Sequence, residues 1–116
     1  MEDIIIKLTG EPYDYKRHLI ITNPNNNLSI SIYFQNTYGK SYGTAFYKAV
    51  ITKLRKLLNI GKLHINKEYH LTPDQAKQFF NIVLDFMAQH PKSPTTTYLK
   101  ENYLLLKQAL DIPTNQ

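Results

Sequence analysis

Three segments within the first 35 residues alternate apolar and polar side chains, and this alternation constrains the fold more than any other feature of the sequence. The clearest of them is residues 28–35. Its alternate positions carry large apolar side chains: Leu28, Ile30, Ile32 and Phe34. Residues 3–9 and 17–23 show the same period of two. Because successive side chains of a strand point to opposite faces, each segment predicts a strand with one apolar face.

The links between these predicted strands are short and rich in residues that favour turns. Residues 10–14 contain Gly and Pro, and residues 23–27 read Asn-Pro-Asn-Asn-Asn. Asn tolerates left-handed backbone geometry and Pro presets its own φ, so both links can reverse the chain. We therefore expect a three-stranded antiparallel meander whose single apolar face needs a helix to cover it.

Apolar side chains recur at helical spacing after this meander. A first helix is predicted to begin near Ser41 or Thr44 and to end near Asn59, with Gly61 as its left-handed terminator. Its opposite side is polar and basic, so this helix is the expected cover for the sheet. A short extra strand is an option at residues 62–65.

Two further helices are expected in the C-terminal half. Thr72-Pro73-Asp74-Gln75 predicts a helix start with a capping box, and His90 lies at the expected end of that helix, before Pro91. Ser93-Pro94 predicts the start of a last helix that reaches about Leu110. The predicted fold class is α+β: a three-stranded antiparallel meander covered by a helix, followed by two further C-terminal helices.

The last predicted helix is apolar over more than half of its circumference. Such a helix is either deeply packed or part of an oligomer interface. If it forms a homodimer, the candidate interface residues are Leu99, Tyr103 and Leu106.

Length and composition predict one folded domain, residues 1–116. The chain has no cysteine, which excludes disulfides and cysteine-ligated zinc and fits a cytoplasmic protein. No apolar run approaches the roughly 18 residues that a membrane span needs. The acidic start, Met1-Glu2-Asp3, is unlike a secretory signal. We therefore expect no membrane association.

The net charge of +5 is concentrated in one half of the chain. Residues 1–62, the predicted meander and first helix, hold nine bases and four acids, whereas residues 63–116 hold five of each. Between Asp14 and Glu68 there is no carboxylate. This asymmetry indicates either a solubilising surface or a face that meets a polyanion.

Aromatic residues are interleaved with these cations. Tyrosine can stack on bases while Lys and Arg hold phosphates, although tyrosine is also an ordinary protein-interface residue. The cations predicted to contact nucleic acid or a partner are Lys16, Arg17, Lys40, Lys48, Lys53, Arg55 and Lys56. The tyrosines predicted to join them are Tyr13, Tyr15, Tyr38 and Tyr42.

Motifs for catalysis are weak. Gly39-Lys40-Ser41 is similar to the end of a phosphate-binding loop, but the position that should hold the first glycine is Phe34. The sequence also has no thiol, no Gly-x-Ser-x-Gly and no spaced carboxylate pair on one element. We therefore expect no enzyme, no catalytic residue and no cofactor.

Three potential metal ligands, His64, Glu68 and His70, are close in sequence. Metal sites usually place their ligands four residues apart on a helix or within a tight loop. A separation of six residues between the histidines, in a predicted strand and loop, does not fit that pattern. No metal is expected.

The overall arrangement resembles small phage and plasmid proteins of the anti-CRISPR type, which stop a type II effector nuclease from taking up guide RNA. The resemblance is carried by the acid-free stretch 15–67 and by the compact meander-plus-helix run 4–58. It implies an inhibitor that binds guide RNA or a protein surface, because a basic chain does not mimic DNA. The three strands and helix also resemble DNA-binding domains that lay a sheet in the major groove.

The sequence thus predicts a non-enzymatic binding protein that acts on nucleic acid or on a nucleic-acid-handling complex. The narrower form of this prediction is an inhibitor encoded by a mobile element, anti-CRISPR-like, that interferes with guide-RNA or DNA binding by an effector nuclease. One alternative is a protein–protein interaction or oligomerisation module without nucleic-acid contact. Another is a sheet-based DNA-binding accessory protein.

Overall fold

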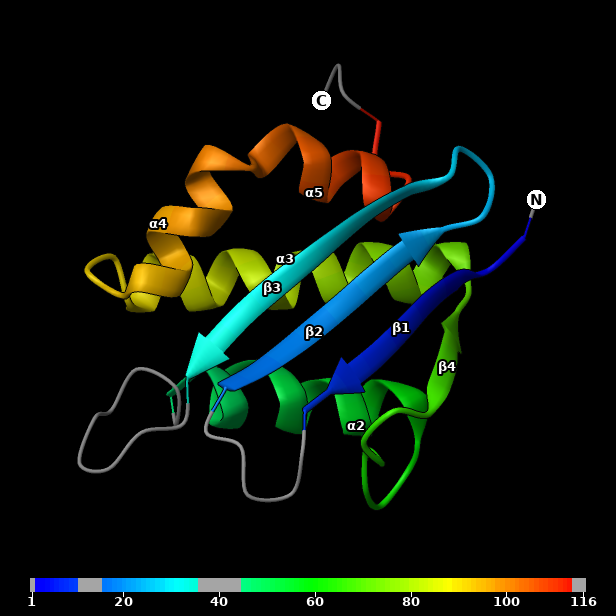
Figure 1. Cartoon of the computed structure of the whole chain (residues 1–116), viewed down its shortest axis with the longest axis horizontal. Coiled ribbons are helices and arrows are strands. Elements are labelled where there is room, and N and C mark those ends of the chain that lie inside the picture. The colour runs from blue at the N-terminus through cyan, green and yellow to red at the C-terminus, as the bar shows by residue number, and fades with distance from the viewer. Residues whose placement is uncertain (1, 11–15, 36–44, 114–116) are drawn as a thin grey trace.

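The computed structural model describes residues 2–10, 16–35 and 45–113. Its strands are β1 (Ile4–Thr9), β2 (Lys16–Asn23), β3 (Leu28–Gln35) and β4 (Glu68–Leu71). Its helical elements are the π-helical turn η1 (Tyr47–Ile51), α2 (Thr52–Leu58), α3 (Pro73–Gln89), α4 (Pro94–Glu101) and α5 (Tyr103–Ala109). The chain is therefore α+β, with a four-stranded antiparallel sheet and four α-helices in its described part (Figure 1).

The predicted meander is present, and a fourth strand extends it. The strand order is β3-β2-β1-β4, with every neighbouring pair antiparallel. The prediction of three strands was wrong because β4 has only four residues, of which Leu71 alone is fully buried. Residues 62–65 form no strand; Ile65 makes only an isolated bridge to Leu8.

The turn between β2 and β3 forms where the asparagine cluster predicted it. Asn27 adopts a left-handed backbone with φ 61°, and its N–H donates to the Asn23 carbonyl at 2.9 Å. The Asn23 side chain accepts from the N–H of Asn25 at 2.9 Å. Asparagine tolerates this backbone region better than other residues with a side chain, so the cluster sets the register of the hairpin.

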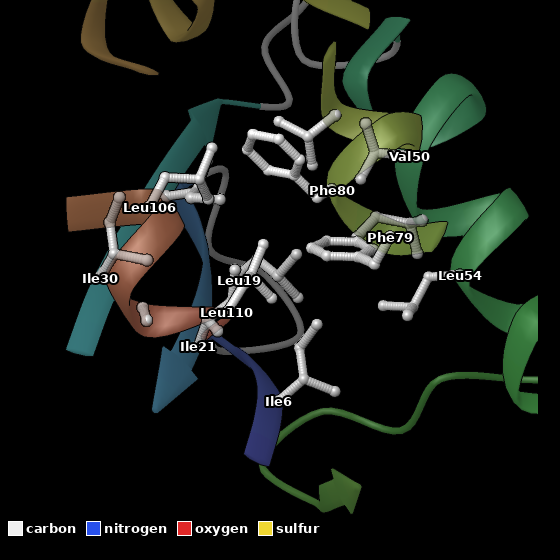
Figure 2. Packing of buried hydrophobic residues seen from close by; sticks show 14 of the residues in the cluster. Ile6, Leu19, Ile21, Ile30, Val50, Leu54, Phe79, Phe80, Leu106 and Leu110 are labelled. Carbon is white, nitrogen blue, oxygen red and sulfur yellow. The ribbon is translucent and has the colours of Figure 1, made fainter. Parts of the chain in front are cut away.

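One face of the sheet is covered by helices. Figure 1 shows α2 and α3 behind the strands, with α5 beside β3. The apolar positions predicted by the alternation face this layer: Ile4, Ile6, Leu8, Leu19, Ile21, Ile30, Ile32 and Phe34 are buried. Leu28, at the start of β3, is the exception and is only half-buried. They pack with Val50, Leu54, Phe79, Leu106 and Leu110 from the helices (Figure 2). We call the opposite side of the sheet the open face.

The helix that follows the meander contains a π-helical turn. The N–H of Thr52 donates to the carbonyl of Tyr47, five residues earlier. The wider turn lets two adjacent residues, Val50 and Ile51, both be fully buried. Phe46 lies immediately before it and stacks on Phe34 of β3 with ring centroids 4.5 Å apart. This contact joins the helix to the end of the sheet.

The end of α2 corrects one expectation. Asn59, and not Gly61, has the left-handed conformation, with φ 57°, and its N–H returns to the carbonyls of Arg55 and Lys56. Asparagine is the second choice for this position after glycine. The sequence contains both residues close together, and the pattern alone did not distinguish them.

The start of α3 has the predicted capping box. The Thr72 hydroxyl accepts from the N–H of Gln75 at 3.2 Å, and the Gln75 side chain accepts from the N–H of Thr72 at 2.9 Å. Pro73 occupies the first turn, and His90 forms the C-cap. This helix crosses behind β3 and β2 at an angle to the strands (Figure 1).

The predicted last helix is two helices, α4 and α5, which meet at Asn102. The Asn102 backbone has φ −115° and ψ 28°, and its side chain donates to the Tyr98 carbonyl at 2.9 Å. An asparagine side chain that bonds to the backbone in this way competes with the regular helix. The bend keeps both Leu99 and Leu106 directed into the core, where each is fully buried.

Within the described ranges, no helix combines the length and the hydrophobicity that crossing a membrane requires.

Candidate nucleic-acid interface

Five of the predicted contact residues lie outside the described residues. They are Tyr13, Tyr15, Tyr38, Lys40 and Tyr42. Lys16 is the first residue of β2 and pairs with Gln35, the last residue of β3. The side chains that can be compared with the prediction are those of the remaining cations, Arg17, Lys48, Lys53, Arg55 and Lys56.

Three of these cations lie together on η1 and α2. Lys48, Lys53 and Lys56 are all exposed, and Lys62 is exposed just beyond the helix. Lys53 and Lys56 are three residues apart, which makes them neighbours on one side of a helix. Lys48 precedes Lys53 by five residues, close to one turn at the π-helical spacing. We call Lys48, Lys53, Lys56 and Lys62 the α2 lysine surface.

No carboxylate accompanies these lysines in sequence. Residues 45–62 contain no Asp or Glu, and the hydrophobic side of the same segment is anchored in the core by Phe46, Val50 and Leu54. A cationic surface without internal ion pairs keeps its full field for an external anion.

The two arginines behave differently from the lysines. The Arg55 guanidinium donates to the Gly61 carbonyl at 2.9 Å, which ties the end of α2 to the following loop. Arg17 pairs with Phe34 and, like Leu19 two residues later, belongs to the helix-covered side of the sheet. Both side chains are half-buried, each with a guanidinium nitrogen that is buried without a hydrogen-bond partner. Neither arginine side chain is as exposed as the lysine side chains.

The open face carries a second group of polar and aromatic side chains. Strand pairing places them in rows across β3, β2 and β1: Tyr33 with His18 and Thr9, Ser31 with Ile20 and Lys7, and Ser29 with Thr22 and Ile5. Sequence reasoning named none of these as site residues. The alternation that places Leu19 and Ile32 inward could have identified His18 and Tyr33 on the other side.

The Tyr33 and His18 rings form a pair on this face. Their centroids are 5.1 Å apart, with the ring planes tilted by 56°. The Nδ1 atom of His18 lies 2.9 Å from the Ser31 hydroxyl oxygen, within hydrogen-bond distance. Both rings are half-buried. The pair is therefore held in one arrangement while part of each ring surface stays accessible.

The three residues predicted for an oligomer interface differ in their exposure. Leu99 and Leu106 are fully buried within the chain, so these two side chains pack in its own core. Tyr103 is 38% exposed, and its neighbour Leu104, which the sequence did not single out, is 57% exposed. Any interface on α5 would have to use Tyr103 and Leu104.

The histidines near β4 do not converge with a third ligand in the described part of the chain. No group of three or more His, Cys, Asp or Glu side chains there has the spacing of a metal site. His64 donates its backbone N–H to the Tyr69 hydroxyl at 2.9 Å, while Glu68 and His70 are exposed on β4.

Two small hollows lie on the helical side of the molecule. One, of about 210 Å³, is lined by residues that include Ile4, Lys77 and Leu110. The other, of about 280 Å³, lies beside Phe80 and Tyr103 and shares Lys77 with the first. Neither is lined by a residue of the α2 lysine surface or by the Tyr33–His18 pair.

No protein-family model, curated protein sequence or solved structure matches this chain. Its function is therefore argued from its own surfaces.

Proposed function

We propose that the protein is a non-enzymatic binding protein for nucleic acid, free or within a nucleoprotein complex, and that the α2 lysine surface contacts the phosphates. The observation that carries the proposal is the exposure of Lys48, Lys53, Lys56 and Lys62 on a segment without a carboxylate. Phosphates along a nucleic-acid strand are closely spaced negative charges, so several neighbouring lysines can act together.

The position of this surface also supports the proposal. Lysine side chains are long and flexible, so their field is useful to a partner only if the backbone below them is fixed. Here Phe46 stacks on Phe34 at 4.5 Å and meets Phe86 edge-on at 5.1 Å. The aromatic contacts anchor the lysine-bearing segment to both the sheet and α3.

The test is a binding titration at several salt concentrations. Labelled single-stranded RNA, single-stranded DNA and duplexes are titrated with the protein, and log K is plotted against log salt. Each phosphate contact contributes a slope of about −0.7 to −0.9. The Lys48→Gln, Lys53→Gln, Lys56→Gln triple variant should bind more weakly, with a slope reduced by about 2 to 3.

A matched control comes from the charge-balanced half. Lys77, Lys92 and Lys100 are also exposed, and replacing all three with Gln changes the net charge by the same amount. This control should keep most of the affinity and the slope. Equal losses in both triple variants would show a diffuse charge effect and would contradict a specific lysine surface.

Absence of binding to every nucleic acid at low salt would rule out direct contact with the free polymer. The nucleoprotein form of the proposal would then be tested by purification of partners from an extract with and without nuclease treatment. Inhibition of a CRISPR effector nuclease stays a prediction, and a cleavage assay with the same two triple variants would test it.

A further inference from the structure

We propose that the open face is a second contact site that receives a single strand of nucleic acid, with one base stacked on the Tyr33 ring beside His18. The inference rests on the proposed function and adds the form of nucleic acid that is bound. The α2 lysine surface alone would hold either a duplex or a single strand, because phosphate contacts do not distinguish bases. The aromatic pair would make that distinction.

The Tyr33–His18 pair has the properties of a stacking site. Its rings are 5.1 Å apart, and the His18 ring is oriented through the 2.9 Å contact between its Nδ1 and the Ser31 hydroxyl. The Tyr33 backbone is held from the other side, because its carbonyl accepts a hydrogen bond from the Thr95 hydroxyl at 3.2 Å. An aromatic ring that is already fixed loses little conformational freedom when a base stacks on it.

Neighbouring side chains on the open face suit a single strand. Lys7 pairs with Ile20 in the row next to His18, about 7 Å along the strands, and on its other side it lies opposite Glu68 of β4. Hydroxyl groups on the adjacent rows can form hydrogen bonds with base edges or ribose: Thr22, Ser29 and Ser31. Bases splayed from a single strand expose the surfaces that such a sheet can read, whereas paired and stacked bases do not.

The carboxylates of this face lie away from the aromatic pair. Strands β2 and β3 contain no carboxylate, and the acidic side chains Asp3 and Glu68 belong to the β1 and β4 side of the sheet. A polyanion that followed β2 and β3 would therefore meet no like charge.

A second copy of the chain is the competing occupant, and the composition of this face disfavours it. Only two large apolar residues, Ile5 and Ile20, lie on this face among the described positions. That composition is poorer in apolar side chains than a stable homodimer requires.

The experiment uses the absence of tryptophan from the chain. Tyr33→Trp places a single indole at the proposed stacking position, and Tyr103→Trp places one on α5 as the matched control. Short mixed-sequence single-stranded RNA and DNA are added to each variant, and tryptophan emission and the anisotropy of the labelled strand are recorded together. We expect strong quenching for Tyr33→Trp and little change for Tyr103→Trp.

Alanine and phenylalanine variants give an independent readout. Tyr33→Ala should weaken single-strand binding by about tenfold or more, the effect of losing one stacked base, while Tyr33→Phe should stay near the parent value. Tyr103→Ala should bind like the parent chain. Circular dichroism and thermal unfolding confirm that each variant is folded, so a loss of affinity is attributed to the ring.

The outcomes separate this inference from the function on which it rests. If the parent chain binds and the lysine variants weaken it, but Tyr33→Trp emission is unchanged at saturation, only the stacking site is wrong. A preference for duplex over single strand, or a dimer in light scattering that Tyr33→Ala dissociates, would also overturn it. If the parent chain binds no nucleic acid at low salt, direct nucleic-acid binding fails first and this inference with it.

Discussion

The Thr95 hydroxyl donates a 3.2 Å hydrogen bond to the backbone carbonyl of Tyr33. The two residues are 62 positions apart in sequence, and the bond fixes the start of α4 against the outer strand of the sheet. A strand at the edge of a sheet leaves backbone groups unpaired, so a helix that satisfies one of them also protects that edge.

Replacing Thr95 with Val removes this hydroxyl while keeping the branched shape. We expect a loss of about 1–2 kcal/mol in the free energy of unfolding, because the Tyr33 carbonyl loses its donor in a part-buried setting. Thr97→Val is the control, since Thr97 is exposed and its hydroxyl bond to Ser93 is long, at 3.5 Å. Urea unfolding measures both; equal effects would show that the Tyr33 bond contributes nothing.

Asn23 joins the β2–β3 turn to the end of α5. Its side chain is fully buried, donates to the Gln108 carbonyl at 2.9 Å and accepts from the N–H of Asn25. Asn23→Ala should reduce the free energy of unfolding by about 2–3 kcal/mol, because two bonds are lost and buried groups are left unpaired.

Asn26 provides the comparison for Asn23. It also donates to the Gln108 carbonyl, at 3.1 Å, but it is exposed, so water can replace its bonds. Asn26→Ala should cost less than about 1 kcal/mol. A larger effect for Asn26 than for Asn23 in chemical unfolding would contradict this assignment.

The end of α2 gives a test of which residue terminates the helix. Asn59 has φ 57°, a left-handed conformation that asparagine tolerates better than alanine does. Asn59→Ala should therefore cost about 1 kcal/mol, whereas Asn59→Gly should be neutral or stabilising. Gly61 lacks a positive φ, and a Cβ added there meets no atom within 4 Å. Gly61→Ala should therefore be tolerated or stabilise by up to about 1 kcal/mol. The reverse order of these melting temperatures would restore Gly61 as the terminator.

Burial raises the pKa of the Tyr98 phenol above its ordinary value of 10.0. The folded chain therefore keeps this proton at a pH where the unfolded chain has released it. Stability from this group is fully present below pH 10 and falls as the pH rises further. Tyr98→Phe should lose less stability than the parent between neutral and alkaline pH. The free energy of unfolding of both proteins is measured by urea unfolding at a series of pH values. An identical dependence on pH in the two proteins would contradict the assignment.

Much of the fold follows from local patterns in the sequence. Leu19, Ile30 and Phe34 were assigned to the buried face from a period of two, and each is buried. The Thr72 capping box was predicted from four consecutive residues because its bonds are local. Features of this kind need no knowledge of distant contacts.

The features that sequence reasoning missed depend on distant contacts. Strand β4 exists because the exposed edge of β1 is available to it, with His70 opposite Ile5, and its own four residues carry too short a pattern. Arg17 was predicted as a surface cation, although its register opposite Phe34 assigns it to the covered side. Leu99 and Leu106 were ambiguous because an apolar helix packs equally well on its own core or on another chain.

The candidate site was predicted only in part for a related reason. Clustering of charge in the sequence identified Lys48, Lys53 and Lys56, and all three side chains are exposed. The pairing of Tyr33 with His18 required the cross-strand register, which no single segment contains. Neighbours across a sheet come from different stretches of chain, so a scan along the sequence does not bring them together.

The π-helical turn at Tyr47–Ile51 has a consequence for how this segment tolerates insertions and deletions. Each residue of an α-helix advances the chain by about 100° around the axis, and a π-turn absorbs one extra residue without breaking the helix. If the same number of residues formed a regular α-helix, Phe46 would be rotated by about 100° relative to Leu54. Phe46 would then leave its place against Phe34 and turn toward the lysine-bearing side. The wider turn therefore keeps the apolar and the cationic sides of one helix in phase. Deletion of one residue from this turn leaves a regular helix in the same phase, so it should be tolerated better than insertion of one.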